Sequence, residues 1–225
     1  MKVMSSLAIK AAYLELVPQF ERKTGHKVET EWVGMADIRK RILAGGSADL
    51  VIGAATLIDE FIAAGAMAPH SRMDLAKSGV GVAVRKGAPR PDISSVEALK
   101  RSLRAAKSIV YSSGPSGIYL AGLFQRLGLA AELKDRMTQT PPGVLVGELV
   151  ARGEKEIAFQ QVPELRQVAG IDFVGELPAE IQTITVFSGG VPLSAKDPDS
   201  AKALVQFLKS PGAARVLRDK GMEPA

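Results

Sequence analysis

Short apolar segments alternate with longer segments of helical periodicity along the first third of the chain. In chain order, the predicted strands and helices span residues 2–4, 7–24, 27–33, 36–44, 50–52 and 55–64. Each predicted helix is followed by a glycine that can end it, at Gly25, Gly45 and Gly65. Successive parallel strands need a crossover connection, which is usually a helix. The pattern therefore predicts an α/β fold with a parallel sheet covered by helices.

The same alternation continues to the end of the chain. Further strands are predicted at residues 79–85, 108–111, 157–160, 173–175 and 183–188, and further helices at 94–103, 118–127, 144–152, 199–209 and 211–220. A chain of 225 residues is long enough for one large domain or for two small lobes that each bury a core. No apolar run approaches the ~18 residues that indicate a membrane span.

Several kinds of chemistry lack their signature. The chain has no cysteine, which excludes disulfides and thiolate metal sites. His26 and His70 are not spaced as metal ligands, and neither a GxSxG nucleophile motif nor a GxxxxGK phosphate loop occurs. We therefore expect no metal and no cofactor, and the spacing names no catalytic residue.

The positive charge of the chain is modest and dispersed. The net charge is +5, and the densest basic cluster is formed by Lys100, Arg101, Arg104 and Lys107 at helical spacing. This arrangement is typical of a solvated helix face. Aromatic residues make up only 5% of the chain, and none interleaves with the cluster as a base-stacking platform would. We expect no nucleic-acid partner, whereas a mild positive field suits a small anionic ligand.

Three loops rich in small residues each follow a predicted parallel strand and precede a helix, at residues 5–6, 34–36 and 112–117. Ligands of open α/β sheets bind at the carboxyl ends of the strands, where helix N-termini hold anions. Helix capping alone is the competing explanation for each loop. The predicted ligand-binding residues of these loops are Ser5, Ser6, Met35, Ala36, Ser113, Ser116 and Gly117.

Two amides end the strand that is predicted at 157–160. The side chains of Gln160 and Gln161 can donate to the oxygens of a carboxylate, or can be satisfied by the backbone at the strand end. Asp49, in contrast, directly precedes a buried strand and is interpreted as structural.

Four segments of the chain resemble the molybdate-binding-protein-like family of type II periplasmic binding proteins. They are KVMSSLAIKAAYLELVPQFERKTGHKV, ADLVIGAA, SSGPSGIYLAGLFQRLG and LVARGEKEIAFQQVPEL. The resemblance implies two α/β lobes, each a mainly parallel sheet flanked by helices, joined by two crossover segments, with the ligand in the cleft between them. It places lobe one at residues 1–78 plus 189–225 and lobe two at residues 79–188.

The resemblance also carries ligand-binding positions onto this chain. Ser6 matches the first serine of the family, whereas the second falls at Met35 or Ala36, so that hydroxyl is lost. The third loop keeps Pro115, Gly117 and Tyr119, a later helix start falls near Gly143, and Gln161 takes the place of a tyrosine. A tetrahedral oxyanion needs a tight cage of donors. The departures therefore favour an organic carboxylate over molybdate.

The resemblance implies a substrate-binding protein that captures a small anionic solute for an ABC-type transporter and its membrane permease. The alternative is an enzyme that resembles aconitate isomerase and moves a proton on a tricarboxylate in the same cleft. Lys10, Tyr13 and Asp37 are candidates for its base by their place near the loops, although a structural or solvent-facing role explains each of them better. A non-catalytic receptor is the favoured interpretation. A third class, a ligand sensor of a transcription regulator, would need a helix-turn-helix segment, which we do not expect here.

The family resemblance further implies a monomer. The start of the chain, MKVMSSLA, does not have the form of a secretory signal. We expect a periplasmic protein if a signal peptide was removed, and a cytoplasmic protein otherwise.

Overall fold

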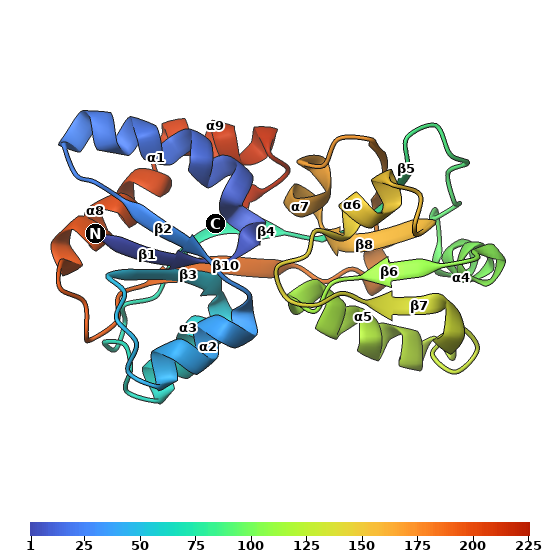
Figure 1. The fold of residues 1–225 in the computed structure, drawn as a ribbon, viewed down its shortest axis with the longest axis horizontal. Coiled ribbons are helices and arrows are strands. Elements are labelled where there is room, and N and C mark those ends of the chain that lie inside the picture. Colours follow the sequence, from blue (N-terminus) through green and yellow to red (C-terminus); the bar gives the residue numbers. More distant parts are fainter. The chain divides into compact units, whose positions relative to one another are not determined.

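The computed structural model describes all 225 residues, Met1–Ala225, as two compact units. Unit 1 consists of Met1–Ser78 and Thr185–Ala225, and unit 2 of Gly79–Ile184 (Figure 1). The chain leaves unit 1 once and returns to it once, as the two expected crossover segments require. The predicted limits differ by four residues, because residues 185–188 lie in a strand of unit 1 rather than in the second lobe.

Unit 1 is built on a six-stranded sheet with the order β11-β4-β10-β3-β1-β2. Its strands are β1 (Lys2–Ser5), β2 (Glu29–Trp32), β3 (Leu50–Ala54), β4 (Met73–Ser78), β10 (Thr185–Gly190) and β11 (Glu223–Pro224). β1 pairs in parallel with β2 and with β3. β10 runs antiparallel to β3 and to β4, and β11 runs antiparallel to β4. The sheet is therefore mixed, with its parallel part at β1, β2 and β3.

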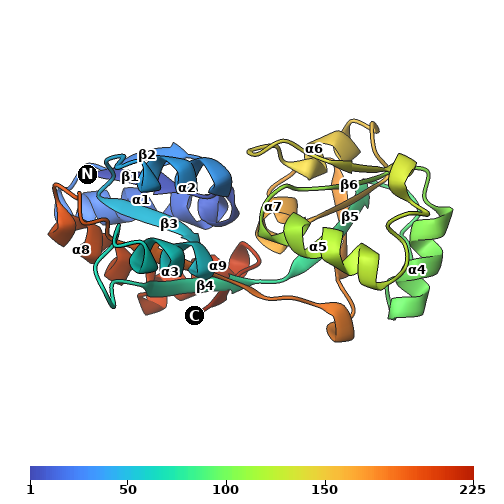
Figure 2. The same cartoon turned by 90° about the horizontal axis from the view of Figure 1, so that it is seen from below.

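Helices cover both faces of this sheet. They are η1 (Leu7–Ile9, a 3-10 turn), α1 (Lys10–Thr24), α2 (Met35–Leu43), α3 (Ala55–Ala63), α8 (Pro198–Leu208) and α9 (Pro211–Asp219). Alternate residues of a strand point to opposite faces, so Val3 packs with α1, α8 and α9 while Met4 packs with α2 and α3. Figure 1 shows α2 and α3 on one side of β1 and β3 and α1 and α9 on the other, and Figure 2 shows the same unit from below.

Unit 2 has a five-stranded sheet with the order β7-β6-β8-β5-β9. Its strands are β5 (Val80–Arg85), β6 (Ile109–Tyr111), β7 (Met137–Gln139), β8 (Ile157–Gln161) and β9 (Ile171–Glu176). β6 pairs in parallel with β7 and β8, whereas β5 runs antiparallel to β8 and β9. This sheet is also mixed, and its parallel part is β7, β6 and β8.

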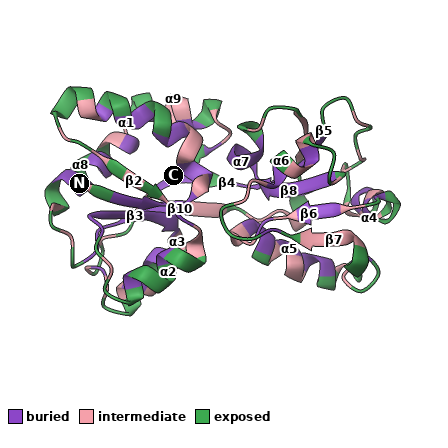
Figure 3. Cartoon of the chain, in the orientation of Figure 1, coloured by how far each residue is buried: buried purple, intermediate pink, exposed green.

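Two layers of helices enclose the second sheet. The helices are α4 (Val96–Ala105), α5 (Pro115–Arg126), α6 (Val146–Ala151) and α7 (Val162–Arg166), with the 3-10 turns η2 (Lys134–Arg136) and η3 (Ala179–Ile181). One core cluster joins α4 and α5 to β5, β6 and β8, and a second joins α6 and α7 to the other face. Figure 3 shows β8 buried along its length. None of the helices in either unit is long and apolar enough to cross a membrane.

The predicted α/β class with two lobes is confirmed, while the sheets are mixed rather than mainly parallel. The strands next to the crossings, β4, β5 and β10, run antiparallel to their neighbours. The sequence did not reveal β4 and β7. β7 is a three-residue edge strand, MTQ, whose side chains are half-buried or exposed, so it has no apolar alternation to detect.

Candidate functional site

The parallel strands of unit 1 end together at one edge of its sheet. β1, β2 and β3 end at Ser5, Trp32 and Ala54, and a helical segment begins within three residues of each end. No side chain caps η1, α2 or α3. The first-turn N–H groups of these segments therefore have no side-chain acceptor, which is the property that makes helix starts bind anions.

Ser5 and Ser6 are both buried at this edge, and their hydroxyls differ in what they contact. The Ser5 hydroxyl donates to the carbonyl oxygen of Ser6 at 3.2 Å. The Ser6 backbone N–H donates to Ile52, but its hydroxyl oxygen has no hydrogen-bond partner in the protein. Capping therefore does not explain the Ser6 side chain. A buried hydroxyl without a partner is costly, so Ser6 is the better suited of the two to donate to a ligand.

Met35 and Ala36 begin α2 and give this edge an apolar part. Met35 packs against both core clusters of unit 1, and a Cβ added at Gly53 would lie 3.4 Å from its sulfur atom. Ala36 is exposed. The thioether of Met35 thus covers the end of β3, at a position where the family resemblance expects a hydroxyl.

The candidate bases of unit 1 lie in different surroundings. Tyr13 is buried, its hydroxyl shares a 2.8 Å hydrogen bond with Thr30, and burial raises the pKa of that hydroxyl above its ordinary value. The raised pKa makes the Tyr13 hydroxyl poorly suited to act as a base. The Lys10 ammonium lies 5.4 Å from the ring centroid of Trp32. Asp37 is exposed in the first turn of α2.

The parallel strands of unit 2 form a second edge, where α5 follows β6. Ser112 and Ser116 are buried, and their hydroxyl oxygens lie 3.1 Å apart. A Cβ added at Gly117 would lie 1.5 Å from the carbonyl oxygen of Ser112, so only glycine fits there. Ser113 is half-buried between β6 and α5. The N-cap residue of α5 is Gly114, which has no side chain to accept from the first-turn N–H groups of the helix.

Gln160 uses its side-chain amide inside the protein. Its oxygen accepts from the N–H of Val146 at the start of α6, and its nitrogen donates to Glu164, both at 3.0 Å. Burial raises the pKa of Glu164 to about 7, against hydrogen bonds from Gln160 and from the Gln161 N–H that lower it. The contacts from Glu164 through Gln160 to Val146 fix where α6 begins, so the side chain of Gln160 has a positioning role inside the protein.

Gln161 and Gly143 complete the predicted residues of unit 2. Gln161 is the buried last residue of β8 and precedes α7. Gly143 lies in an exposed turn with a φ of +84°, three residues before α6 begins. Its backbone conformation requires glycine, and the helix start expected there lies at Val146 instead.

Thr140 is a residue of this edge that the sequence did not single out. It directly follows β7, and its N–H donates to the carbonyl oxygen of Tyr111 at 3.0 Å. Its side chain is buried, and the hydroxyl oxygen has no hydrogen-bond partner in the protein. The only signal in the sequence is a hydroxyl residue before Pro141, in a segment without strand periodicity.

The structure sorts the predicted residues into two sets. Ser5, Ser6, Met35 and Ala36 share the edge of unit 1. The loop at 112–117 belongs to the corresponding edge of unit 2, with the two glutamines. The three loops therefore lie at two sheet edges rather than at one. Each edge combines a buried serine or threonine hydroxyl that has no protein partner with a helix start that has no side-chain cap.

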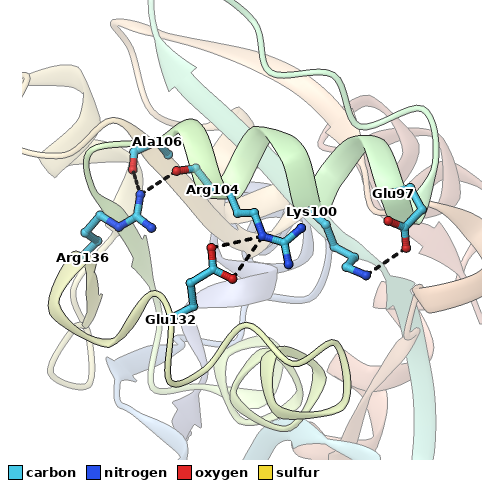
Figure 4. Close-up of polar contacts among 6 residues, drawn as sticks. All are labelled: Glu97, Lys100, Arg104, Ala106, Glu132 and Arg136. Carbon is cyan, nitrogen blue, oxygen red and sulfur yellow. Dashed lines mark hydrogen bonds and ion pairs between the residues drawn. The ribbon is translucent and has the colours of Figure 1, made fainter.

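Two residues of the basic cluster on α4 form ion pairs with glutamates (Figure 4). Lys100 pairs with Glu97 at 2.9 Å, and Arg104 pairs with Glu132 at 3.1 Å. Arg136 donates to two carbonyl groups at the end of α4. These contacts partly neutralise the cluster on an exposed helix face, as the spacing of its residues predicted.

This chain is similar to known proteins along nearly its whole length. The family model described as bacterial extracellular solute-binding protein matches residues 1–223. An aconitate isomerase from Pseudomonas sp is 39% identical over 230 residues, which cover 99% of this chain and 87% of that protein. A molybdate-binding protein from Azotobacter vinelandii is 25% identical over 215 residues, 92% of this chain and 83% of that protein. The solved periplasmic molybdate-binding protein of Azotobacter vinelandii superposes with a TM-score of 0.82 at 19% identity, over 99% of this chain and 98% of that one.

Proposed function

Because this chain belongs to the bacterial extracellular solute-binding protein family, with the type II periplasmic binding protein fold, we propose that it binds a tricarboxylate and isomerises it as an aconitate isomerase does. The observation that carries the proposal is the 39% identity to an aconitate isomerase across 99% of the chain. Identity to the molybdate-binding relative is 25%. The receptor function favoured from the sequence becomes the second candidate.

The two sheet edges supply the kind of donors that carboxylates need. Ser6 offers a buried hydroxyl in unit 1, and α5 offers the N–H groups of its uncapped first turn in unit 2. A helix N-terminus favours negative charge. Met35 supplies apolar surface where a hydroxyl would complete a cage for a small oxyanion. This mixture of donors and apolar contacts supports an organic anion over molybdate.

The isomerisation needs a base that removes a proton next to the double bond of the substrate and returns it at the other end of the allylic unit. Donors to the carboxylate oxygens stabilise the negative charge that develops meanwhile. Tyr13 is a weaker candidate for the base, because burial raises the pKa of its hydroxyl. Asp37 has a solvent-exposed carboxylate in the first turn of α2, at the edge that holds Ser6. We therefore assign Asp37 as the base, and Lys10 as a cation for a substrate carboxylate.

The test is proton NMR of cis- and trans-aconitate with catalytic amounts of the protein in D2O. We expect the isomers to interconvert and deuterium to enter the carbon that exchanges its proton. Heat-denatured protein is the control for uncatalysed exchange. Binding of aconitate without interconversion or deuterium uptake would overturn the assignment as an isomerase.

A solute receptor without catalysis is supported by the family description and by the fold shared with the molybdate-binding protein. In that case the protein works outside the cytoplasm and delivers its ligand to an ABC-transporter permease. A thermal-shift screen decides between ligand classes, because a ligand at a hundredfold excess over Kd stabilises the folded state by about 2.7 kcal/mol. The screen compares molybdate, tungstate, sulfate and phosphate with di- and tricarboxylates. A shift with molybdate or tungstate alone contradicts a carboxylate ligand, whether the protein is an isomerase or a receptor.

A further inference from the structure

We propose that the hydroxyl of Thr140 is a ligand contact that donates a hydrogen bond to a carboxylate oxygen beside the start of α5. This inference deepens the proposed function and rests on it, since it names a residue that selects the carboxylate. Thr140 lies outside the three loops and the glutamine pair that the sequence pointed to.

The first argument is the burial of Thr140. The residue is 4% exposed, and its hydroxyl oxygen has no hydrogen-bond partner in the protein. Buried polar side chains almost always have a hydrogen-bond partner, because without one the free energy of removing the group from water is not offset. The backbone N–H of Thr140 donates to the carbonyl oxygen of Tyr111, so the group that lacks a partner is the side-chain hydroxyl.

The second argument is the position that the strand register gives to Thr140. Tyr111 of β6 is level with Gln139 of β7, so the next residues along the two chains, Ser112 and Thr140, are level as well. The Gln139 side chain donates to the Ser112 carbonyl oxygen at 3.3 Å, which ties the two strand ends together. Thr140 therefore lies at the carboxyl edge of the parallel strands, next to the segment that leads into α5.

The third argument is that an uncapped helix start and a pair of serines lie beside this position. Ser112 and Ser116 are hydrogen-bonded to each other at 3.1 Å. α5 has 12 residues and begins without a side-chain cap, so its dipole and first-turn N–H groups favour an anion at this place. Thr140 adds a second hydroxyl donor, because the bond between the two serines uses the proton of one hydroxyl and leaves that of the other. A carboxylate, with two oxygens, accepts from the helix start and from Thr140 at once.

The experiment compares three variants of the full chain by calorimetric titration with trans-aconitate and by thermal unfolding without ligand. Thr140→Val removes the hydroxyl and keeps the shape. Thr140→Ser keeps the hydroxyl. Thr138→Val is the matched control, since it removes a hydroxyl from the same strand whose oxygen is paired with Lys155 at 2.8 Å.

We expect Thr140→Val to raise the Kd by about tenfold to a hundredfold, the range for a lost hydrogen bond to a charged group. Its unfolding temperature should stay the same or rise, because the hydroxyl has no partner in the protein. Thr140→Ser should bind like the parent, and Thr138→Val should keep the parent Kd while its unfolding temperature falls. A structural role for Thr140 predicts loss of thermal stability with little change in Kd.

The inference is wrong if Thr140→Val binds within about twofold of the parent, or if Thr138→Val weakens binding as much. If the parent protein binds no tricarboxylate, the proposed function and this inference are both wrong. If the parent binds aconitate without isomerising it, only the isomerase assignment is wrong, and the Kd of the variants still tests Thr140.

Discussion

Replacement of Glu164 by glutamine should change how the stability of this protein depends on pH. Glu164 is buried, and burial raises the pKa of its carboxyl from 4.5 to about 7. Between those two values the folded state holds a proton that the unfolded state has lost. Stability therefore falls as the pH rises through this window, and the contribution of the neutral carboxyl is complete only below the unfolded pKa.

The magnitude follows from the size of the shift. Each pKa unit corresponds to 1.36 kcal/mol, so a rise from 4.5 to about 7 costs about 3 kcal/mol at pH 8 relative to pH 4. Glutamine has nearly the same shape and no charge. It can still accept from Gln160 through its side-chain oxygen, as the carboxyl does at 3.0 Å. The variant should therefore lose the pH-dependent cost while it keeps the link to the start of α6.

The assay is urea denaturation of the parent and of Glu164→Gln at about pH 4.5, 6, 7 and 8. The difference in unfolding free energy between the two proteins should move in favour of the variant by about 3 kcal/mol across this range. Glu148→Gln, which changes an exposed glutamate of α6, is the control. Parallel stability curves for the parent and Glu164→Gln would refute the reasoning, because they would mean that Glu164 titrates alike in both states.

Three further predictions concern Asp49, Gly117 and Asp37. Burial alone would raise the pKa of Asp49, but three backbone N–H donors outweigh it and hold the pKa below its usual value. Asp49→Asn should cost about 1–3 kcal/mol at neutral pH, and the gap in denaturation midpoints should close as the pH falls below about 4. Gly117→Ala should destabilise the chain by at least about 2 kcal/mol, seen as an earlier thermal transition, because its Cβ would collide with Ser112; an unchanged transition contradicts the close approach. Asp37→Asn should lower kcat for aconitate at least about a hundredfold with little change in KM; unaltered turnover removes Asp37 as the base.

The alternation of apolar strands and amphipathic helices was sufficient to predict the α/β class. Segments such as β1, α1 and β3 could be located because each carries a local period, two residues for a strand and 3.6 for a helix. Elements without such a period were missed, among them the edge strand β7 and the five-residue helix α7. The resemblance to type II periplasmic binding proteins, which the family match confirms, supplied the two-lobed architecture.

The candidate site was predicted less completely, because its parts come from distant segments. The sequence marked Ser6 and the loop before α5, since small residues between a strand and a helix are a local signal. The sequence did not indicate that the Gln160 amide accepts from Val146 and donates to Glu164, because folding brings these residues together. Whether the ten predicted residues contact a ligand stays a prediction.

Sequence by itself determined which segments become strands and helices in this protein, and that short loops with free N–H groups follow the parallel strands, because these properties depend on neighbouring residues. Only the tertiary structure decided which buried polar groups are satisfied. Ser112 and Ser116 look like two independent donors in the sequence, but one of their hydroxyls donates to the other. Thr140 looks like part of a loop, but its buried hydroxyl has no partner in the protein. The physical reason is that a hydrogen bond depends on distances between atoms, which strand register and packing set and residue order alone does not.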